Sequence, residues 1–249
     1  MRSSAASDVY KRQEQNMSLR NASPSMDHWF GTDRMGRDIF VRILFGARIS
    51  LAVGCLAAVI NLIVGTIYGG IAGYVGGKVD MVMMRIVDII YSVPAMLYIV
   101  LIMLIFGASV ISIMLGISIT CWIDMARIVR QQVKSLKEQE FTMAAFVLGA
   151  SPSRILIKHL LINTMGQIIV TVTLMVPQAI FTEAWLSFLG VGISAPMASW
   201  GTLAQDARQL IMTYPMQTVY PMIAICITIF SFNFVGEGLE KALDPKRKR

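Results

Sequence analysis

Few residues in this sequence have the types and spacing needed for catalysis. The Gly-Gly-Lys run at 76–78 looks like the end of a phosphate-binding loop. That motif requires Gly at position 72 and Ser or Thr after the lysine, however, and this sequence has Ala and Val there. The three cysteines lie far apart, and His28 and His159 are isolated, so neither a metal site nor a disulfide framework is predicted. Paired carboxylates and nucleophile–base arrangements are also missing from the apolar segments. The sequence therefore does not favour an enzyme.

Carboxylates at the ends of apolar segments are the remaining candidates. Asp88 follows Arg85, and Asp124 precedes Arg127, so each carboxylate is predicted to form a local ion pair at the membrane interface. Asp88 could instead line a transport path.

Glu183 is the carboxylate placed deepest in an apolar segment, and it follows a helix-weakening residue, Pro177. A carboxylate at membrane depth is costly unless it is paired or hydrated. Pro177 and Glu183 are therefore candidates for a translocation path. Bracing of a neighbouring helix is the slightly favoured interpretation for Glu183.

The composition indicates a membrane protein. Of the 249 residues, 55% are hydrophobic and 15% are charged, whereas a soluble protein carries about 25% charged residues. A net charge of +7 is also found in proteins that bind nucleic acid. The basic residues cluster between apolar runs and at the C-terminus, however, and this is typical of cytoplasmic loops. Nucleic-acid binding is not predicted.

Apolar runs predict an all-α polytopic membrane bundle of about five spans. The predicted spans cover residues 49–74, 86–106, 110–128, 166–189 and 215–235. Residues 78–85 are expected to form a polar turn, and Pro94 to kink the second span. Glycines at 65, 69, 73 and 77 recur at every fourth position and predict close helix packing.

Residues 140–163 are too polar to span a bilayer and read as two short helices around a break. Gly149 can enter the left-handed conformation that ends the first helix. Ser151 is placed to cap the second helix, and Pro152 suits its first turn. From the pattern alone, a hairpin lying on lipid headgroups is about as plausible as a docking element.

Residues 28–48 form an amphipathic segment before the first predicted span. Thr32 or Asp33 is placed to cap a helix there. The segment contains Gly31-Thr32-Asp33 and, after two residues, Gly36-Arg37-Asp38.

Two motifs resemble the permease subunits of ABC importers. The hairpin resembles their EAA loop at Glu140, Ala144, Ala145, Gly149, Ala150, Ser151, Arg154 and Ile155, although Met143 stands where the family commonly has Glu. The earlier segment resembles the GTDxxGRD signature of the peptide and nickel subfamily at Gly31, Thr32, Asp33, Gly36, Arg37 and Asp38.

The resemblance implies a permease domain over residues 27–249, with a cytoplasmic coupling loop over 134–165 that docks on an ATPase. The expected partners are a second, homologous permease, two ABC ATPase subunits that bind and hydrolyse ATP, an extracytoplasmic substrate-binding protein and the lipid bilayer. The chain itself would need no cofactor. The expected location is the bacterial or archaeal cytoplasmic membrane.

Di- or oligopeptides are the expected substrates, imported by alternating access. Nickel or another small solute is the alternative within the same architecture. A secondary transporter driven by an ion gradient is disfavoured, because the predicted spans carry few ionisable residues and show no internal repeat.

The charge distribution predicts that the hairpin and the basic residues 246–249 both lie in the cytoplasm. Counting spans back from the hairpin then places residues 28–48 outside, despite their arginines. In the family this segment follows a first span. We therefore expect a truncated six-span permease, with residues 1–26 disordered or non-native.

Overall fold

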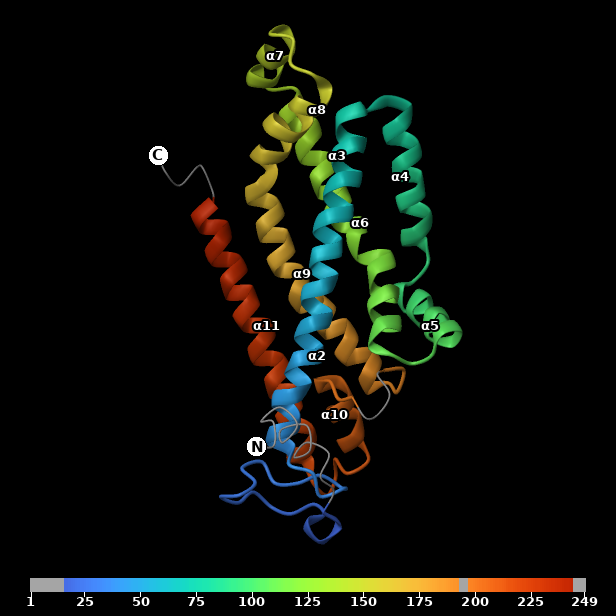
Figure 1. The fold of residues 1–249 in the computed structure, drawn as a ribbon, viewed down its shortest axis with the longest axis vertical. Helices are drawn as coiled ribbons and strands as arrows, with labels where there is room; N and C mark the ends of the chain where they lie inside the picture. The colour runs from blue at the N-terminus through green and yellow to red at the C-terminus, as the bar shows by residue number, and fades with distance from the viewer. Residues whose placement is uncertain (1–15, 193–196, 244–249) are drawn as a thin grey trace, which may run out of the picture.

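The computed structural model describes residues 16–192 and 197–243, and the regular structure in this part of the chain is helical. Figure 1 shows long helices running side by side, with short helices at both ends. The longer helices are α2 (Ile39–Ile60), α3 (Thr66–Val75), α4 (Gly77–Ser92), α5 (Ala95–Phe106), α6 (Val110–Lys137), α9 (Ile162–Phe188) and α11 (Pro215–Leu243). The short ones are α7 (Glu140–Val147), α8 (Pro152–Arg154) and α10 (Trp200–Arg208).

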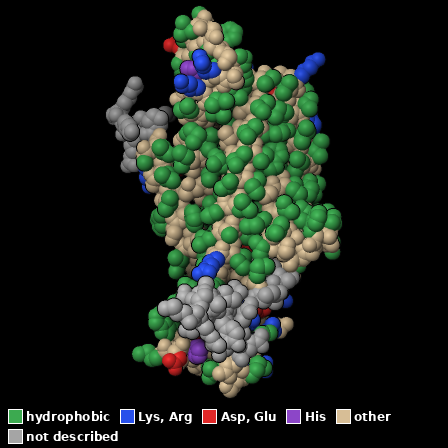
Figure 2. Space-filling view, in the orientation of Figure 1, with side chains coloured by type: hydrophobic (Ala, Val, Ile, Leu, Met, Phe, Trp, Pro, Cys, Tyr) green, Lys and Arg blue, Asp and Glu red, His purple; other side chains and the backbone are tan. Residues whose placement is uncertain are grey.

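The described residues contain four helices long and apolar enough to cross a membrane, or five if a bent pair counts as one. The predicted all-α membrane bundle is thus confirmed. Hydrophobic side chains cover most of the middle of the face shown in Figure 2, as expected for a surface in contact with lipid. The hairpin and the end of α11 lie at one end of the bundle, and the described N-terminal residues and α10 lie at the other (Figure 1).

The first span is one continuous helix from Ile39 to Val75, because a π-helical turn at Asn61–Gly65 joins α2 to α3. Its glycines let α6 approach closely. A Cβ atom on Gly65 would lie 2.5 Å from Met125, and one on Gly69 would lie 2.3 Å from the Ala126 carbonyl oxygen. Gly73 packs in the same way, which confirms the predicted glycine face at three positions. Gly77 instead begins α4 with nothing nearby.

The second span differs from its prediction. Residues 78–85 are helical, as part of α4, and the expected polar turn is wrong. The helix ends at Ser92, and α5 starts after Pro94 at an angle of 75°. Pro94 therefore produces a break rather than a kink. The cause is that proline lacks an N–H donor and forces the residue before it into an extended conformation.

The start of α2 also differs from its prediction. The helix begins at Ile39, and the carboxylate of Asp38 accepts a hydrogen bond from the Val41 N–H at 2.9 Å. Neither Thr32 nor Asp33 caps it. Both side chains are used in the turn that precedes the helix.

Candidate functional site

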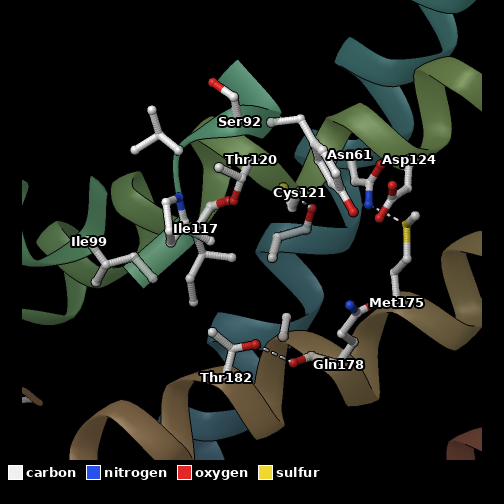
Figure 3. Close-up of a pocket in the computed structure, with 16 residues that line it drawn as sticks. Asn61, Ser92, Ile99, Ile117, Thr120, Cys121, Asp124, Met175, Gln178 and Thr182 are labelled. Atoms are coloured by element: carbon white, nitrogen blue, oxygen red, sulfur yellow. Dashed lines mark hydrogen bonds between the residues drawn. The ribbon is translucent and has the colours of Figure 1, made fainter. Parts of the chain in front are cut away.

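A cavity of about 480 Å³ opens between the helices at the break that separates α4 from α5. Figure 3 shows side chains from α2, the π-helical turn, α6 and α9 around it. Its lining combines apolar and polar residues: Ala57, Asn61, Tyr91, Ser92, Val93, Pro94, Ala95, Ile99, Ile117, Thr120, Cys121, Asp124, Met175, Gln178, Ala179 and Thr182. An irregular backbone at membrane depth is tolerated where it lines such a cavity. This arrangement suits passage of a polar solute.

Asp124 is a cavity residue, and the predicted interfacial pair with Arg127 is wrong. Helix α6 continues for 13 residues beyond Asp124, to Lys137, so the carboxylate lies near the middle of the helix. Arg127 instead donates to Asp88 across the interface with α4 at 3.1 Å, so Asp88 does not pair with Arg85 as predicted. The prediction failed because helix α6 ends nine residues later than its apolar pattern indicates.

Glu183 is fully buried at the junction of α2, α9 and α10. Its two carboxylate oxygens accept hydrogen bonds from the hydroxyls of Ser50, at 3.1 Å, and Ser187, at 2.8 Å. The Ser50 hydroxyl in turn accepts the Trp200 N–H of α10 at 3.3 Å. This geometry favours bracing. Neither Glu183 nor Pro177 is among the residues that line the cavity, whereas Gln178 and Thr182 of the same helix are.

The hairpin at the other end of α6 is closed by a left-handed residue. Gly149 has φ +79°, and its N–H bonds the Phe146 carbonyl at 3.0 Å. The Ala150 N–H bonds the Ala145 carbonyl at 3.1 Å, which completes a Schellman motif. The predicted break at Gly149 is confirmed. Pro152 starts α8 as expected, but the Ser151 side chain makes no capping hydrogen bond.

The eight candidate hairpin residues divide into an anchor and a surface. Ala145 and Ile155 are buried, in a cluster with Met125, Val129 and Val133 of α6. This cluster fixes the hairpin, whose helices α7 and α8 lie at one end of the bundle in Figure 1. The exposed candidates are Glu140, Ala144, Gly149, Ser151 and Arg154, while Ala150 is half-buried.

Sequence reasoning missed the most exposed part of the hairpin. Phe146, Val147 and Leu148 are 72%, 83% and 86% exposed, and Met143 and Phe141 are exposed beside them. We call these five residues the hairpin patch. Their run of apolar residues in the sequence was the available signal, but none of the five was among the candidate site residues. Large apolar side chains grouped outside the lipid-facing region indicate a surface that another molecule covers.

Charged residues of the GTDxxGRD segment form a largely buried network with Arg42 and Asp206. The Asp33 carboxylate accepts from Arg37 and from Arg42, each at 2.7 Å. Arg42 also reaches Asp206 of α10 at 3.2 Å, and Arg34 lies 3.7 Å from the same carboxylate. The burial of Arg42 and the partial burial of Arg37 are tolerated because both are paired. Asp206, far away in sequence, was the partner that the sequence did not reveal.

The remaining signature residues shape the turn before α2. Gly31 and Gly36 have φ +72° and +70°, and a Cβ on Gly36 would clash with the Asn16 backbone. The Thr32 hydroxyl accepts the Ala22 N–H at 2.8 Å and donates to the Leu19 carbonyl. Residues 16–26 therefore pack on the signature, in contrast with the disorder expected for residues 1–26. Residues 1–15 and 246–249 lie outside the described residues.

Known proteins resemble this chain in both sequence and fold. Residues 65–249 match the family model described as "Binding-protein-dependent transport system inner membrane component". The chain belongs to this family. It is therefore a multi-pass membrane component of a transport system, and the predicted resemblance is confirmed.

Relatives with assigned names are similar over nearly the whole chain. The oligopeptide transport system permease protein OppC of Bacillus subtilis is 52% identical over 94% of this chain and 77% of its own length. The dipeptide permease DppC of the same organism is 48% identical over 94% of this chain and 74% of its own length. OppC of Escherichia coli is 44% identical over 92% of this chain and 76% of its own length.

The fold is shared with a solved transporter. A chain of the MetNI methionine ABC transporter, in an inward-facing crystal form, superposes with a TM-score of 0.66 at 17% identity. The match covers 83% of this chain and 96% of that one. The common fold is thus the membrane bundle of an ABC importer.

Proposed function

We propose that this chain is a permease subunit of an ATP-driven importer that moves di- or oligopeptides across the bacterial or archaeal cytoplasmic membrane. The observation that carries the proposal is the 44–52% identity to oligopeptide and dipeptide permeases over nearly all of the chain. The cavity at the α4–α5 break adds physical support, because its polar lining suits a solute rich in hydrogen-bonding groups.

The hairpin patch is the proposed docking surface for an ABC ATPase. Its large apolar side chains are suited to fill a groove on a soluble partner, and Gly149 fixes their direction through the Schellman motif. ATP is bound and hydrolysed by two such partner subunits, and this chain needs no cofactor of its own. Glu140, Ser151 and Arg154 form the polar rim of the surface, and the small exposed Ala144 allows close approach of the partner.

A second, homologous permease and an extracytoplasmic binding protein complete the proposed assembly. The binding protein delivers peptide at the end of the bundle that carries the Asp33–Arg42 network. Closure of the ATPases moves the hairpin, and the buried anchor at Ala145 and Ile155 transmits this movement to α6 and α9. The cavity is then opened to one side of the membrane at a time.

Peptide uptake by the reconstituted assembly tests this proposal. The chain is purified with its partner permease, ATPases and binding protein, placed in proteoliposomes, and supplied with a radiolabelled dipeptide or tetrapeptide. ATP-dependent accumulation of peptide is the expected result, and vesicles without ATP are the control. Accumulation of Ni²⁺ without peptide uptake would assign the chain to the alternative substrate, and failure to accumulate peptide would overturn the proposal.

A further inference from the structure

Asp124 is a carboxylate in a membrane-spanning helix, and the described residues provide it with no counter-ion. It lies near the middle of α6, and its side chain is exposed on the wall of the cavity. A charged side chain placed in lipid at this depth costs about 3 kcal/mol, so such residues face water-filled cavities or partners. Its position thus indicates that the cavity is hydrated and carries a negative charge.

Asn61 provides a second, independent observation at the same cavity. It is 1% exposed, lies in the π-helical turn of the first span, and lines the cavity together with Asp124 (Figure 3). Its amide nitrogen donates to the Met175 sulfur, but its amide oxygen is buried and has no partner among the described residues. An orphaned buried acceptor costs about 1–3 kcal/mol, and a π-helical turn inside an α-helix is frequently found at functional sites. The asparagine oxygen thus lacks a hydrogen-bond donor, which a ligand in the cavity could supply.

Cations of the protein do not occupy this position. The cavity lining contains no Lys, Arg or His among the described residues. Arg127, one turn from Asp124 on α6, donates to Asp88 and lies 4.4 Å over the ring of Tyr91. Further along α6, Arg130 and Lys134 are both paired with a single carboxylate of α4, Asp80.

From these contacts we propose that Asp124 and Asn61 form an ammonium-binding subsite, which receives the positively charged amino group of the substrate during transport. The inference rests on the proposed function, since a peptide with a free amino terminus is the substrate that carries this group. An ammonium has three N–H donors and a positive charge, which match one carboxylate and one orphaned amide oxygen. Two such groups are too few for a protein metal site, and the described residues contain no cluster of three metal-ligating side chains.

The sign of the charge in the cavity can be measured without transport. Cys121 lines the cavity, whereas Cys55 and Cys226 are exposed elsewhere, so a Cys55→Ser, Cys226→Ser background leaves one reporter thiol. The assembled complex is treated with a cationic or an anionic methanethiosulfonate reagent, and modification of this chain is followed by mass spectrometry. Thr182→Cys, at another point of the lining, serves as a second reporter.

We expect the cationic reagent to react faster than the anionic one, and Asp124→Asn to lower this ratio about tenfold, as the loss of one nearby negative charge requires. The exposed Asp27, at the extracytoplasmic end, offers a matched control: Asp27→Asn should leave the ratio unchanged. An equal rate for both reagents in the unsubstituted cavity, or a ratio that Asp124→Asn does not change, would overturn the subsite.

Peptide uptake then tests whether the substrate uses the subsite. We expect Asp124→Asn to lower the uptake rate about tenfold, and Asp124→Glu to retain most of it, because the charge is kept. Membrane levels and recovery of the partner subunits are measured for each variant to confirm assembly. Full uptake by Asp124→Asn would overturn the inference and leave the proposed function intact, whereas absence of peptide uptake in the unsubstituted complex would contradict the proposed function itself.

Discussion

The two ends of the bundle differ in whether their side chains have partners within the chain. At the end that carries the GTDxxGRD segment, three arginines share two aspartates. The turn before α2 is held by hydrogen bonds to residues 16–26 and α11 and by ion pairs to α10. At the hairpin end, the Schellman motif is complete but the hairpin patch lies open (Figure 1). One end pairs its charged side chains within the chain, and the other presents an apolar surface.

This contrast shows that a sequence motif can either stabilise the chain or present a surface to a partner. The GTDxxGRD residues Thr32 and Asp33 point inward and stabilise the chain, since they are 0% and 7% exposed. The hairpin motif combines a buried anchor with an exposed surface. Substitutions at the first end should therefore change stability, and substitutions at the second should change assembly and coupling.

The largest effect on stability is expected from Asp33→Ala. The substitution leaves Arg42 buried with only the more distant Asp206 as its partner, which should cost about 3 kcal/mol. The melting temperature of the detergent-solubilised protein measures this loss, with Asp27→Ala as the exposed control. A melting temperature equal to that of the control would show that the network does not hold this end together.

A smaller effect is expected from Glu183→Ala, which leaves the hydroxyls of Ser50 and Ser187 without their acceptor. The expected loss is about 2 kcal/mol. Glu183→Gln keeps an acceptor and should recover about half of it. If both variants keep the normal melting temperature but lose peptide uptake, Glu183 belongs to the path and the bracing interpretation is wrong.

At the hairpin end, Gly149→Val should cost about 1–2 kcal/mol locally, because a β-branched residue is strained at φ +79°. No atom lies within 4 Å of the added Cβ, so the strain is in the backbone alone. We expect lower peptide uptake per ATP hydrolysed, with an almost unchanged melting temperature. Gly149→Asn is the matched variant, since asparagine tolerates this conformation, and it should retain more coupling. Full uptake with normal coupling in Gly149→Val would rule out this role.

The sequence predicted those features that depend on local pattern. Apolar runs located the spans, glycines at every fourth position located the α2–α3 contact with α6, and Gly149 located the hairpin break. The resemblance at Gly31–Asp38 and Glu140–Ile155 also led to the family that the comparisons confirm.

Features that depend on long-range contacts were missed or wrongly assigned. Asp206 joins Arg42 across 164 positions of the chain, and Arg127 joins Asp88 across 39, so neither pair can be read from neighbouring residues. The position of Asp124 near the middle of α6 was not predicted, because the apolar pattern ends at residue 128 whereas the helix continues to Lys137. The hairpin patch was overlooked because an apolar run in sequence does not show which side of it faces the protein.

Co-purification tests the central claim, that the hairpin patch is where an ATPase docks. The chain is tagged and isolated from its native membrane as the unsubstituted protein, as Leu148→Asp and as Met26→Asp, with quantitative mass spectrometry of the proteins recovered. Leu148 and Met26 are 86% and 94% exposed and lie at opposite ends of the molecule. The account predicts two ATP-binding subunits and a second permease with the unsubstituted chain and with Met26→Asp, and loss of most of the ATP-binding subunits with Leu148→Asp. Equal recovery of those subunits with Leu148→Asp would contradict it.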